Sequence, residues 1–174
     1  LQAYYPTTFM ASAYEIINLW ISRMIMMSGF HLGTVPFKKV IFHGLVRDSQ
    51  GRKFSKSLGN GIDPLVMIDK YGADALRMGL VMGSAIGSDQ SFEESRVKGY
   101  KNFANKIWNI ARFVLENVEK SDIMEPHDLS LVDQEDIAEL NRVVADVTKH
   151  LDEYRIDLAA ERAYHYVWHT FADE

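Results

Sequence analysis

The order of strand-like and helix-like segments in residues 5–46 constrains the fold more than any other feature of this chain. Thr7–Ala11 is a short strand candidate, and Tyr14–Gly29 places apolar residues at the i, i+3/i+4 spacing of a helix that stops at Gly29. Lys39–Gly44 is then a β-branched and aromatic run of strand length. Strand, helix and strand in this order predict a parallel βαβ unit, the building block of a Rossmann-like sheet. A sheet of only two such strands has bare edges, which favour self-association.

A lysine- and serine-rich loop, Gly51–Asn60, follows this unit and has a composition suited to gripping a polyphosphate. Lys53 and Lys56 each supply a mobile positive charge, and Ser55 and Ser57 supply hydroxyl donors. The flanking glycines allow the backbone to approach an anion closely. If the five residues Lys53–Ser57 are considered on their own, a solvated basic surface loop is the favoured alternative. A small hairpin is expected just before it, between residues 45 and 52.

Helical patterns dominate the rest of the chain. Asp63 and Pro64 predict the start of a short helix that runs through Lys70, and residues 73–82 predict another. Residues 83–87 are small and form the best candidate boundary between two domains.

Long amphipathic helices are expected after that boundary. Ser91–Glu94 has the pattern of a capping box and opens a helix to about Glu119. A loop is expected over residues 121–131, then a helix over 133–151 and a third that begins with Asp157 as N-cap. The expected buried stripes consist of Tyr100, Phe103, Ala104, Ile107, Ala111, Val114 and Val118, followed by Ile137, Leu140, Val144, Val147 and Leu151. Three antiparallel helices of this kind form a bundle.

Composition excludes some classes of protein. An apolar fraction of 47% with 11% aromatic residues is that of an ordinary folded protein rather than a disordered one. The absence of cysteine excludes a disulfide framework and thiolate metal sites. The longest apolar stretch, residues 16–30, contains Asn18, Arg23 and two serines, so it is too short and too polar to cross a bilayer. The net charge of −5 is unusual for a dedicated nucleic-acid module, but a large protein can be acidic overall and basic only in patches, so the net charge decides little.

Several motifs together resemble one enzyme family. Lys53–Ser57 reads Lys-Phe-Ser-Lys-Ser and is similar to KMSKS, the second signature of the class I aminoacyl-tRNA synthetases, with Phe54 in place of Met. Gly59–Pro64 and Ile68–Arg77 resemble the block that follows this signature in the valyl, isoleucyl and leucyl enzymes. Four further segments are similar to the valyl branch in particular: Trp20–Met27, Val35–Lys38, His43–Asp48 and Asn102–Asn109. The resemblance extends from about Tyr5 to the C-terminal end.

The resemblance implies a fold of the α/β plus all-α class that is predominantly helical overall. Residues 1–87 are expected to form the C-terminal half of a Rossmann-like class I catalytic domain, and residues 88–174 the start of a helical anticodon-binding bundle. The implied activity is ATP-dependent attachment of valine to its tRNA through an aminoacyl-adenylate, in the cytoplasm. ATP is then a substrate and Mg²⁺ its counter-ion. The family's first signature, HIGH, is absent from this sequence, so the chain alone is expected to be inactive.

The same resemblance assigns expected roles to individual residues. Lys53 and Lys56 correspond to the lysines that close over the phosphates of ATP, with Ser55 and Ser57 as helpers. His43, Gly44 and Leu45 stand where the family presents backbone to the adenine ring; for His43, a satisfied core histidine is an equal alternative. Gly44 suits close approach of a ligand to the backbone.

Two further positions carry expected ligand contacts. Glu15 stands where the family has an aspartate that contacts the ATP ribose, and Ala13 stands where it has glycine, so this contact departs from the family pattern. Trp20 corresponds to a residue that borders the amino-acid side chain, and an ordinary core tryptophan is the alternative.

Other interpretations remain open from the sequence. An isoleucyl or leucyl enzyme is the nearest rival, and a non-catalytic tRNA- or protein-binding module derived from such an enzyme is the second. Phe30–Thr34 imitates the HIGH signature, but its position at the end of a helix indicates a connector. Six cations are candidates for tRNA phosphate contacts, although a solvated helical face is favoured for each: Arg96, Lys98, Lys101, Lys106, Arg142 and Lys149. His165 and His169 have no third ligand at suitable spacing, so no metal site is predicted.

Overall fold

The computed structural model describes residues 3–118 and 129–172. The chain forms two compact units, each assembled from two stretches of sequence. The first unit comprises residues 1–61 and 84–92, and the second comprises residues 62–83 and 93–174.

These units do not coincide with the predicted ranges 1–87 and 88–174. Residues 62–83 pack with the long helix that follows them, and residues 84–92 pair with the strand after the βαβ segment. The domain boundary at Gly87 stays a prediction. The predicted loop over residues 121–131 and the end of the preceding helix at Glu119 lie wholly or largely outside the described residues.

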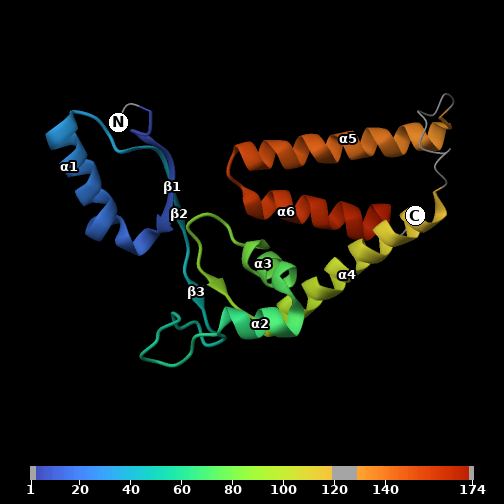
Figure 1. Ribbon diagram of the computed structural model, residues 1–174, viewed down its shortest axis with the longest axis horizontal. Helices are drawn as coiled ribbons and strands as arrows, with labels where there is room; N and C mark the ends of the chain where they lie inside the picture. The colour runs from blue at the N-terminus through green and yellow to red at the C-terminus, as the bar shows by residue number, and fades with distance from the viewer. Residues whose placement is uncertain (1–2, 119–128, 173–174) are drawn as a thin grey trace. The chain divides into compact units, whose positions relative to one another are not determined.

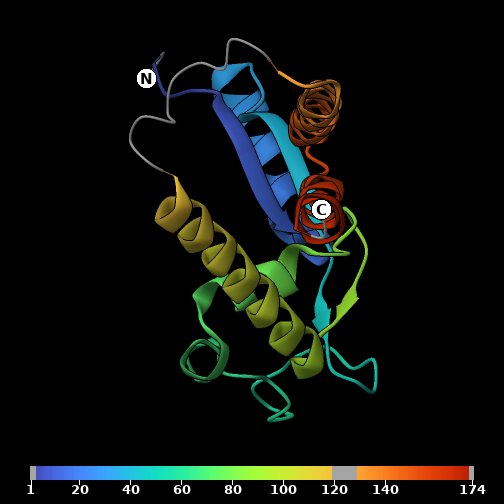
Figure 2. The same cartoon turned by 90° about the vertical axis from the view of Figure 1, so that its right-hand side faces the viewer.

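The first unit contains the predicted parallel βαβ arrangement. Strands β1 (Thr7–Ala13) and β2 (Phe37–His43) pair in parallel, from Thr7 opposite Phe37 to Ala13 opposite His43. The crossover between them consists of a 3₁₀ turn, η1 (Tyr14–Ile16), a π-helical segment, η2 (Ile17–Ile21), and helix α1 (Ser22–Leu32). Figure 2 shows the two strands side by side with this helical crossover beside them.

Helix α1 runs nearly one turn beyond Gly29, so the predicted stop at that residue was wrong. The chain leaves the helix at Gly33, whose φ of 66° is left-handed and whose N–H donates to Gly29 O at 3.1 Å. Glycine adopts this conformation without a steric penalty, which explains why Gly33 ends the helix. His31 therefore lies in the last turn of α1, at the end of a helix as predicted, but residues 30–32 of the predicted connector are helical.

A second, smaller parallel pair was not predicted. Strand β3 (Val46–Arg47) pairs with β4 (Gln90–Ser91), and Gln90 N–H donates to Leu45 O at 2.9 Å. The predicted hairpin is confirmed, because Arg47 also forms an antiparallel bridge with Lys53.

The predicted capping box at Ser91–Glu94 is absent. Ser91 belongs to β4 and its hydroxyl donates to Asp48 O at 3.3 Å, so it cannot cap the next helix. Helix α4 (Glu94–Asn117) instead begins after Glu93, which makes no capping hydrogen bond with its side chain. Pairing with a distant strand outweighs the local capping pattern here.

The second unit begins with two short helices that agree with prediction. In α2 (Pro64–Tyr71), Asp63 is the N-cap and its carboxylate accepts from Leu65 N–H at 2.9 Å. Helix α3 (Ala73–Val81) packs against α4, where the side chain of Val97 lies 3.1 Å from a Cβ built at Gly79. The buried core of these helices consists of Met67, Ala75, Leu76, Met82, Val97 and Phe103.

Helices α5 (Leu131–Asp152) and α6 (Ile156–His165) run antiparallel beside each other, as Figure 1 shows, and α6 continues into the π-helical segment η4 (Tyr166–Phe171). A capping box that was not predicted opens α5, where Ser130 and Asp133 exchange hydrogen bonds of 3.1 and 2.9 Å. Asp157 was predicted as the N-cap of the third helix, but that cap is Arg155. Asp157 lies in the first turn, buried and bonded to the Arg155 guanidinium.

The predicted buried stripes are correct only where helices meet. Phe103 is buried against Tyr164 and Trp168, with ring centroids 4.6 and 5.7 Å apart. On α5 the buried residue is Val143, and several members of the two stripes are exposed: Ile107, Val114, Val118, Ile137, Leu140, Val144 and Leu151.

Within the described ranges, no helix combines the length and apolarity that a bilayer crossing requires.

Candidate functional site

The carboxyl ends of β1 and β2 lie side by side and bring five residues discussed in the sequence analysis to one edge of the first unit. Ala13 and His43 are register partners at the ends of the two strands. Glu15 follows β1, while Gly44 and Leu45 follow β2. Ligands of open parallel sheets bind at this edge, because the loops that leave the strands diverge there.

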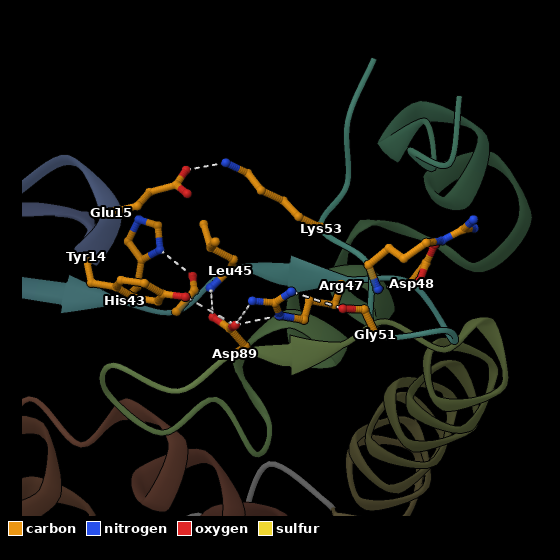
Figure 3. A network of polar contacts seen from close by, with 11 residues as sticks. Tyr14, Glu15, His43, Leu45, Arg47, Asp48, Gly51, Lys53 and Asp89 are labelled. Carbon is orange, nitrogen blue, oxygen red and sulfur yellow. Dashed lines mark hydrogen bonds and ion pairs between the residues drawn. The ribbon is translucent and has the colours of Figure 1, made fainter. Parts of the chain in front are cut away.

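The lysine loop reaches the same edge. Figure 3 shows the carboxylate of Glu15 pointing toward the ammonium of Lys53, with which it forms an ion pair. Both side chains stay partly exposed, at 50% for Lys53 and 39% for Glu15, so the pair faces solvent above the strand ends. The structure therefore brings together the predicted phosphate-binding lysine and the predicted ribose-binding acid.

Asp48 and Asn60 brace the loop from within. The Asp48 carboxylate accepts from Arg52 N–H at 2.8 Å, from the Arg52 guanidinium at 2.8 Å and from the Asn60 amide at 2.9 Å. Asn60 in turn accepts from Ser55 N–H at 2.9 Å and donates to Lys53 O at 3.1 Å. The hydrogen bond from Asn60, followed by those from Arg52, holds the pKa of Asp48 well below its usual range.

The tip of the loop leaves its second lysine available. The hydroxyls of Ser55 and Ser57 lie 2.7 Å apart, and Gly59 turns the chain with a φ of 61°. Lys56 is exposed, and its ammonium has no ion pair or hydrogen bond with any residue that the structure describes. A mobile cation beside two hydroxyls is suited to binding a phosphate group.

Gly44 is confined by the protein's own backbone. A Cβ built at this position would lie 1.8 Å from Ser88 O and 2.6 Å from Asp89 N. The missing side chain is therefore required by packing against the 88–89 segment, whatever ligand the site takes. His43 Nδ1 donates to Gly44 O at 2.8 Å, so the imidazole is tied to the backbone at the strand end rather than to a core.

Asp89 is a residue of this site that sequence reasoning missed. Its carboxylate accepts from Leu45 N–H at 2.8 Å, from Arg47 Nε at 2.5 Å and from the Tyr14 hydroxyl at 3.2 Å. The Leu45 N–H bond, and then those from Arg47 and Tyr14, lower the pKa of Asp89, whereas Asp89 raises that of Arg47. No local pattern marks Asp89, because its partners lie more than forty positions away in the sequence.

Trp20 lies apart from these contacts, on the π-helical segment η2. Its side chain is 56% exposed, which argues against the core alternative. Its role beside an amino-acid side chain stays a prediction.

Most of the candidate cations of the second unit bond to the protein itself. Arg96 donates to Met82 O at 2.8 Å, Lys101 to Lys70 O at 3.1 Å and Lys106 to Trp168 O at 2.9 Å, while Arg142 pairs with Glu139. His165 and His169 stack with ring centroids 5.4 Å apart. In the part of the chain that the structure describes, no three His, Cys, Asp or Glu side chains group as metal ligands would.

Comparison with protein families gives two matches. The family described as tRNA synthetases class I (I, L, M and V) matches residues 1–93 of this chain, and the anticodon-binding domain of tRNA ligase matches residues 133–174.

Curated relatives cover nearly the whole chain. It is 46% identical to a valine–tRNA ligase of Clostridium tetani over 178 residues, and 46% identical to the corresponding ligase of Carboxydothermus hydrogenoformans over 175 residues. Each alignment covers 99% of this chain and 20% of the relative, so the chain spans about a fifth of the length of these relatives.

Solved structures share the fold at lower identity. Methionyl-tRNA synthetase from Mycobacterium tuberculosis, in complex with methionyl-adenylate, superposes with a TM-score of 0.74 at 24% identity, over 94% of this chain and 33% of that one. A LeuRS from Agrobacterium radiobacter, in a ternary complex with tRNA and LeuAMS, gives a TM-score of 0.72 at 20% identity, over 96% of this chain and 24% of that one.

Proposed function

Because the chain belongs to the class I tRNA synthetases of the I, L, M and V group, we propose that it is part of an ATP-dependent valine–tRNA ligase. The observation that carries the proposal is the 46% identity to valine–tRNA ligases across 99% of the chain. The geometry supports it, since the lysine loop and the two strand ends lie together in the first unit.

In the first proposed step, a carboxylate oxygen of valine attacks the α-phosphorus of ATP. A new O–P bond forms, and pyrophosphate leaves with the electron pair of the broken bond. Phosphoryl transfer depends on positioned positive charge, because negative charge is redistributed over the phosphates in the transition state. Lys53 and Lys56 supply that charge, and the hydroxyls of Ser55 and Ser57 donate to phosphate oxygens. The exposed ammonium of Lys56, which has no partner among the described residues, supports its role.

The nucleoside part of ATP is placed at the carboxyl ends of β1 and β2. The backbone of residues 43–45 faces the adenine ring, and Glu15 accepts hydrogen bonds from the ribose hydroxyls. Glu15 and Lys53 are bonded to each other, so nucleotide binding exchanges their ion pair for a ribose contact and a phosphate contact. Trp20 borders the side chain of valine in this proposal.

Mg²⁺ is expected to arrive as the counter-ion of ATP. Mg²⁺ keeps several waters and is usually bound through substrate phosphates and one or two carboxylates, so the phosphates of ATP are expected to supply part of its coordination. In this proposal, the side chains described above bind and orient the nucleotide whether or not they also contact Mg²⁺.

The second proposed step transfers the valyl group to the terminal ribose of the tRNA, with valine isoacceptors as partners. The match of residues 133–174 to an anticodon-binding domain supports tRNA as the partner of the second unit. We place the protein in the cytoplasm, where tRNA charging serves protein synthesis.

Aminoacylation by the full-length protein tests this function. Purified protein is incubated with ATP, tRNA and either valine, isoleucine or leucine in parallel. Selective charging with valine is expected. Selective charging with isoleucine or leucine would reassign the substrate, and a folded protein that charges none of the three would leave a non-catalytic tRNA- or protein-binding module.

A further inference from the structure

Asp89 occupies a junction between three segments that carry the predicted nucleotide-binding residues. We propose that Asp89 is a positioning residue, which fixes the backbone at the end of β2 and, through Arg47, the base of the lysine loop. The inference rests on the proposed function, because it concerns how this site is held for ATP.

The first contact fixes the strand end. Both backbone polar groups of Leu45 are hydrogen-bonded. Its N–H donates to Asp89 Oδ1 at 2.8 Å, and its carbonyl accepts from Gln90 N–H at 2.9 Å. Gly44 packs without a Cβ against the Ser88 carbonyl. The backbone proposed to face adenine is thus bonded to the 88–90 segment and cannot shift independently of it.

The second contact fixes the base of the loop. Arg47 donates to Asp89 Oδ2 through Nε at 2.5 Å and also through a terminal nitrogen, so two donors of one planar guanidinium meet the same charged oxygen. Its other terminal nitrogen donates to Gly51 O at 3.0 Å, in the turn from which the loop begins. The backbone of Arg47 also bridges Lys53. Through Arg47, Asp89 therefore helps to fix the position of Lys53.

The third contact closes a ring around the strand ends. The Tyr14 hydroxyl donates to Asp89 Oδ2 at 3.2 Å, and Tyr14 directly precedes Glu15, which pairs with Lys53. Figure 3 shows His43 and Leu45 between the Glu15–Lys53 pair on one side and the Asp89–Arg47 pair on the other. Both carboxylate oxygens of Asp89 accept bonds from the protein, so Asp89 acts through its partners and does not itself bind the nucleotide.

A role of this kind predicts a specific kinetic pattern. Asp89→Asn keeps one oxygen for Leu45 N–H but turns an amide NH₂ toward the donors of Arg47 and Tyr14. The strand end and the loop then lose their common anchor, whereas the predicted valine contact at Trp20 is not bonded to Asp89. We expect the KM for ATP to rise by about tenfold while the KM for valine stays within about twofold.

The test is valine-dependent ATP–pyrophosphate exchange by the full-length protein, with Tm measured for every variant. Asp63→Asn is the matched control, because Asp63 also accepts a backbone N–H with its carboxylate but lies at the start of α2. Arg47→Lys is a milder second variant, which keeps the charge but removes the planar guanidinium that reaches both Asp89 Oδ2 and Gly51 O. It keeps the inference testable if Asp89→Asn fails to fold. Its KM for ATP is expected to rise in the same direction.

The double variant Asp89→Asn/Arg47→Lys separates coupling from independent effects. If Asp89 acts on the loop through Arg47, the double variant raises the KM for ATP less than the product of the two single effects. If the wild-type protein is active and Asp89→Asn leaves the KM for ATP unchanged, the inference is overturned but the proposed function is not. Equal losses toward ATP and valine together with a lower Tm would also overturn it, since they indicate a merely structural residue. A folded wild-type protein without valine-dependent exchange would overturn the proposed function, and the inference with it.

Discussion

At Gly44, the space available to a single side chain is set by the backbone of another segment. A Cβ at this position would lie 1.8 Å from Ser88 O, far inside van der Waals contact, and the obstacle is backbone that cannot rotate away. The sequence predicts close approach of a ligand to Gly44, which stays a prediction, whereas the structure gives Gly44 a packing role against Ser88. Its substitution therefore tests the architecture of the strand ends.

We expect Gly44→Ala to destabilise the protein by about 1–3 kcal/mol, the usual cost of overpacking. The matched control is Gly61→Ala, because a Cβ at Gly61 meets nothing within 4 Å and its φ is not left-handed. Thermal unfolding of both variants measures the difference. An equal Tm for the two variants would contradict the packing described at Ser88.

Substitution of Glu15 is expected to weaken ATP binding without changing the stability of the protein. Its ion pair with Lys53 is partly exposed, and such pairs contribute only about 0–1 kcal/mol, so Glu15→Gln is expected to leave Tm nearly unchanged. The neutral amide is a weaker acceptor for ribose hydroxyls, so the KM for ATP is expected to rise by about threefold or more in pyrophosphate exchange. Glu116→Gln is the control, since Glu116 forms an exposed ion pair with Arg112 on α4. A wild-type KM in Glu15→Gln would remove the ribose contact.

At the scale of elements, the loop Gly51–Asn60 owes its shape to one carboxylate and one amide. Asp48 has a lowered pKa in the folded protein, mainly because of its hydrogen bonds from Asn60 and Arg52. The stabilisation that it contributes is therefore fully present above the ordinary aspartate pKa of about 3.9, and it is lost as the pH falls below that value toward the lowered one.

Asp48→Asn is expected to loosen the loop at neutral pH. Trypsin should then cleave faster at Arg52, Lys53 and Lys56, because the donors of the loop lose their ionised acceptor. The difference in Tm between wild type and this variant should be constant above about pH 5 and shrink in more acidic solution. Asp69→Asn, at an exposed position of α2, is the control. Unchanged cleavage in the loop would show that Asp48 does not hold it.

Elements with a strong local signal were predictable from sequence. The βαβ unit, the hairpin at residues 45–52 and the start of α2 at Asp63 all follow from periodicity or from side chains close in sequence. Strand β4 is two residues long and has no periodicity, so its pairing with β3 carries no sequence signal. Asp89 was missed for the same reason, because its role arises only when distant segments meet.

Helix ends and buried faces were less predictable. The capping box of α5 uses an aspartate at the third position rather than the glutamate or glutamine of the usual pattern, so it was not recognised at Ser130. A helical stripe also gives the apolar face but not how much of it a neighbour covers. Along α4 the last buried residue of the stripe is Phe103, while Ile107 and Val114 on the same stripe are each 43% exposed.

At the scale of the whole molecule, the chain corresponds to about a fifth of the length of its curated relatives. In the proposed function, its described residues supply one edge of the nucleotide site, with the loop, two strand ends and the junction at Asp89. We expect residues 1–174 alone to give no measurable valine-dependent pyrophosphate exchange under conditions in which the full-length protein is active. Exchange at a comparable rate by the isolated chain would show that this edge suffices.

In the proposed function, Gly51–Asn60 binds the phosphates of ATP through Lys56. Valine-dependent ATP–pyrophosphate exchange by the full-length protein, with Lys56→Ala beside Lys98→Ala, tests it most directly. Lys98 is an exposed lysine on α4, so its removal controls for the loss of one surface charge. We predict that Lys56→Ala lowers the exchange rate by at least about 100-fold with an unchanged Tm, and that Lys98→Ala retains wild-type activity. Equal activity of the two variants would contradict the claim.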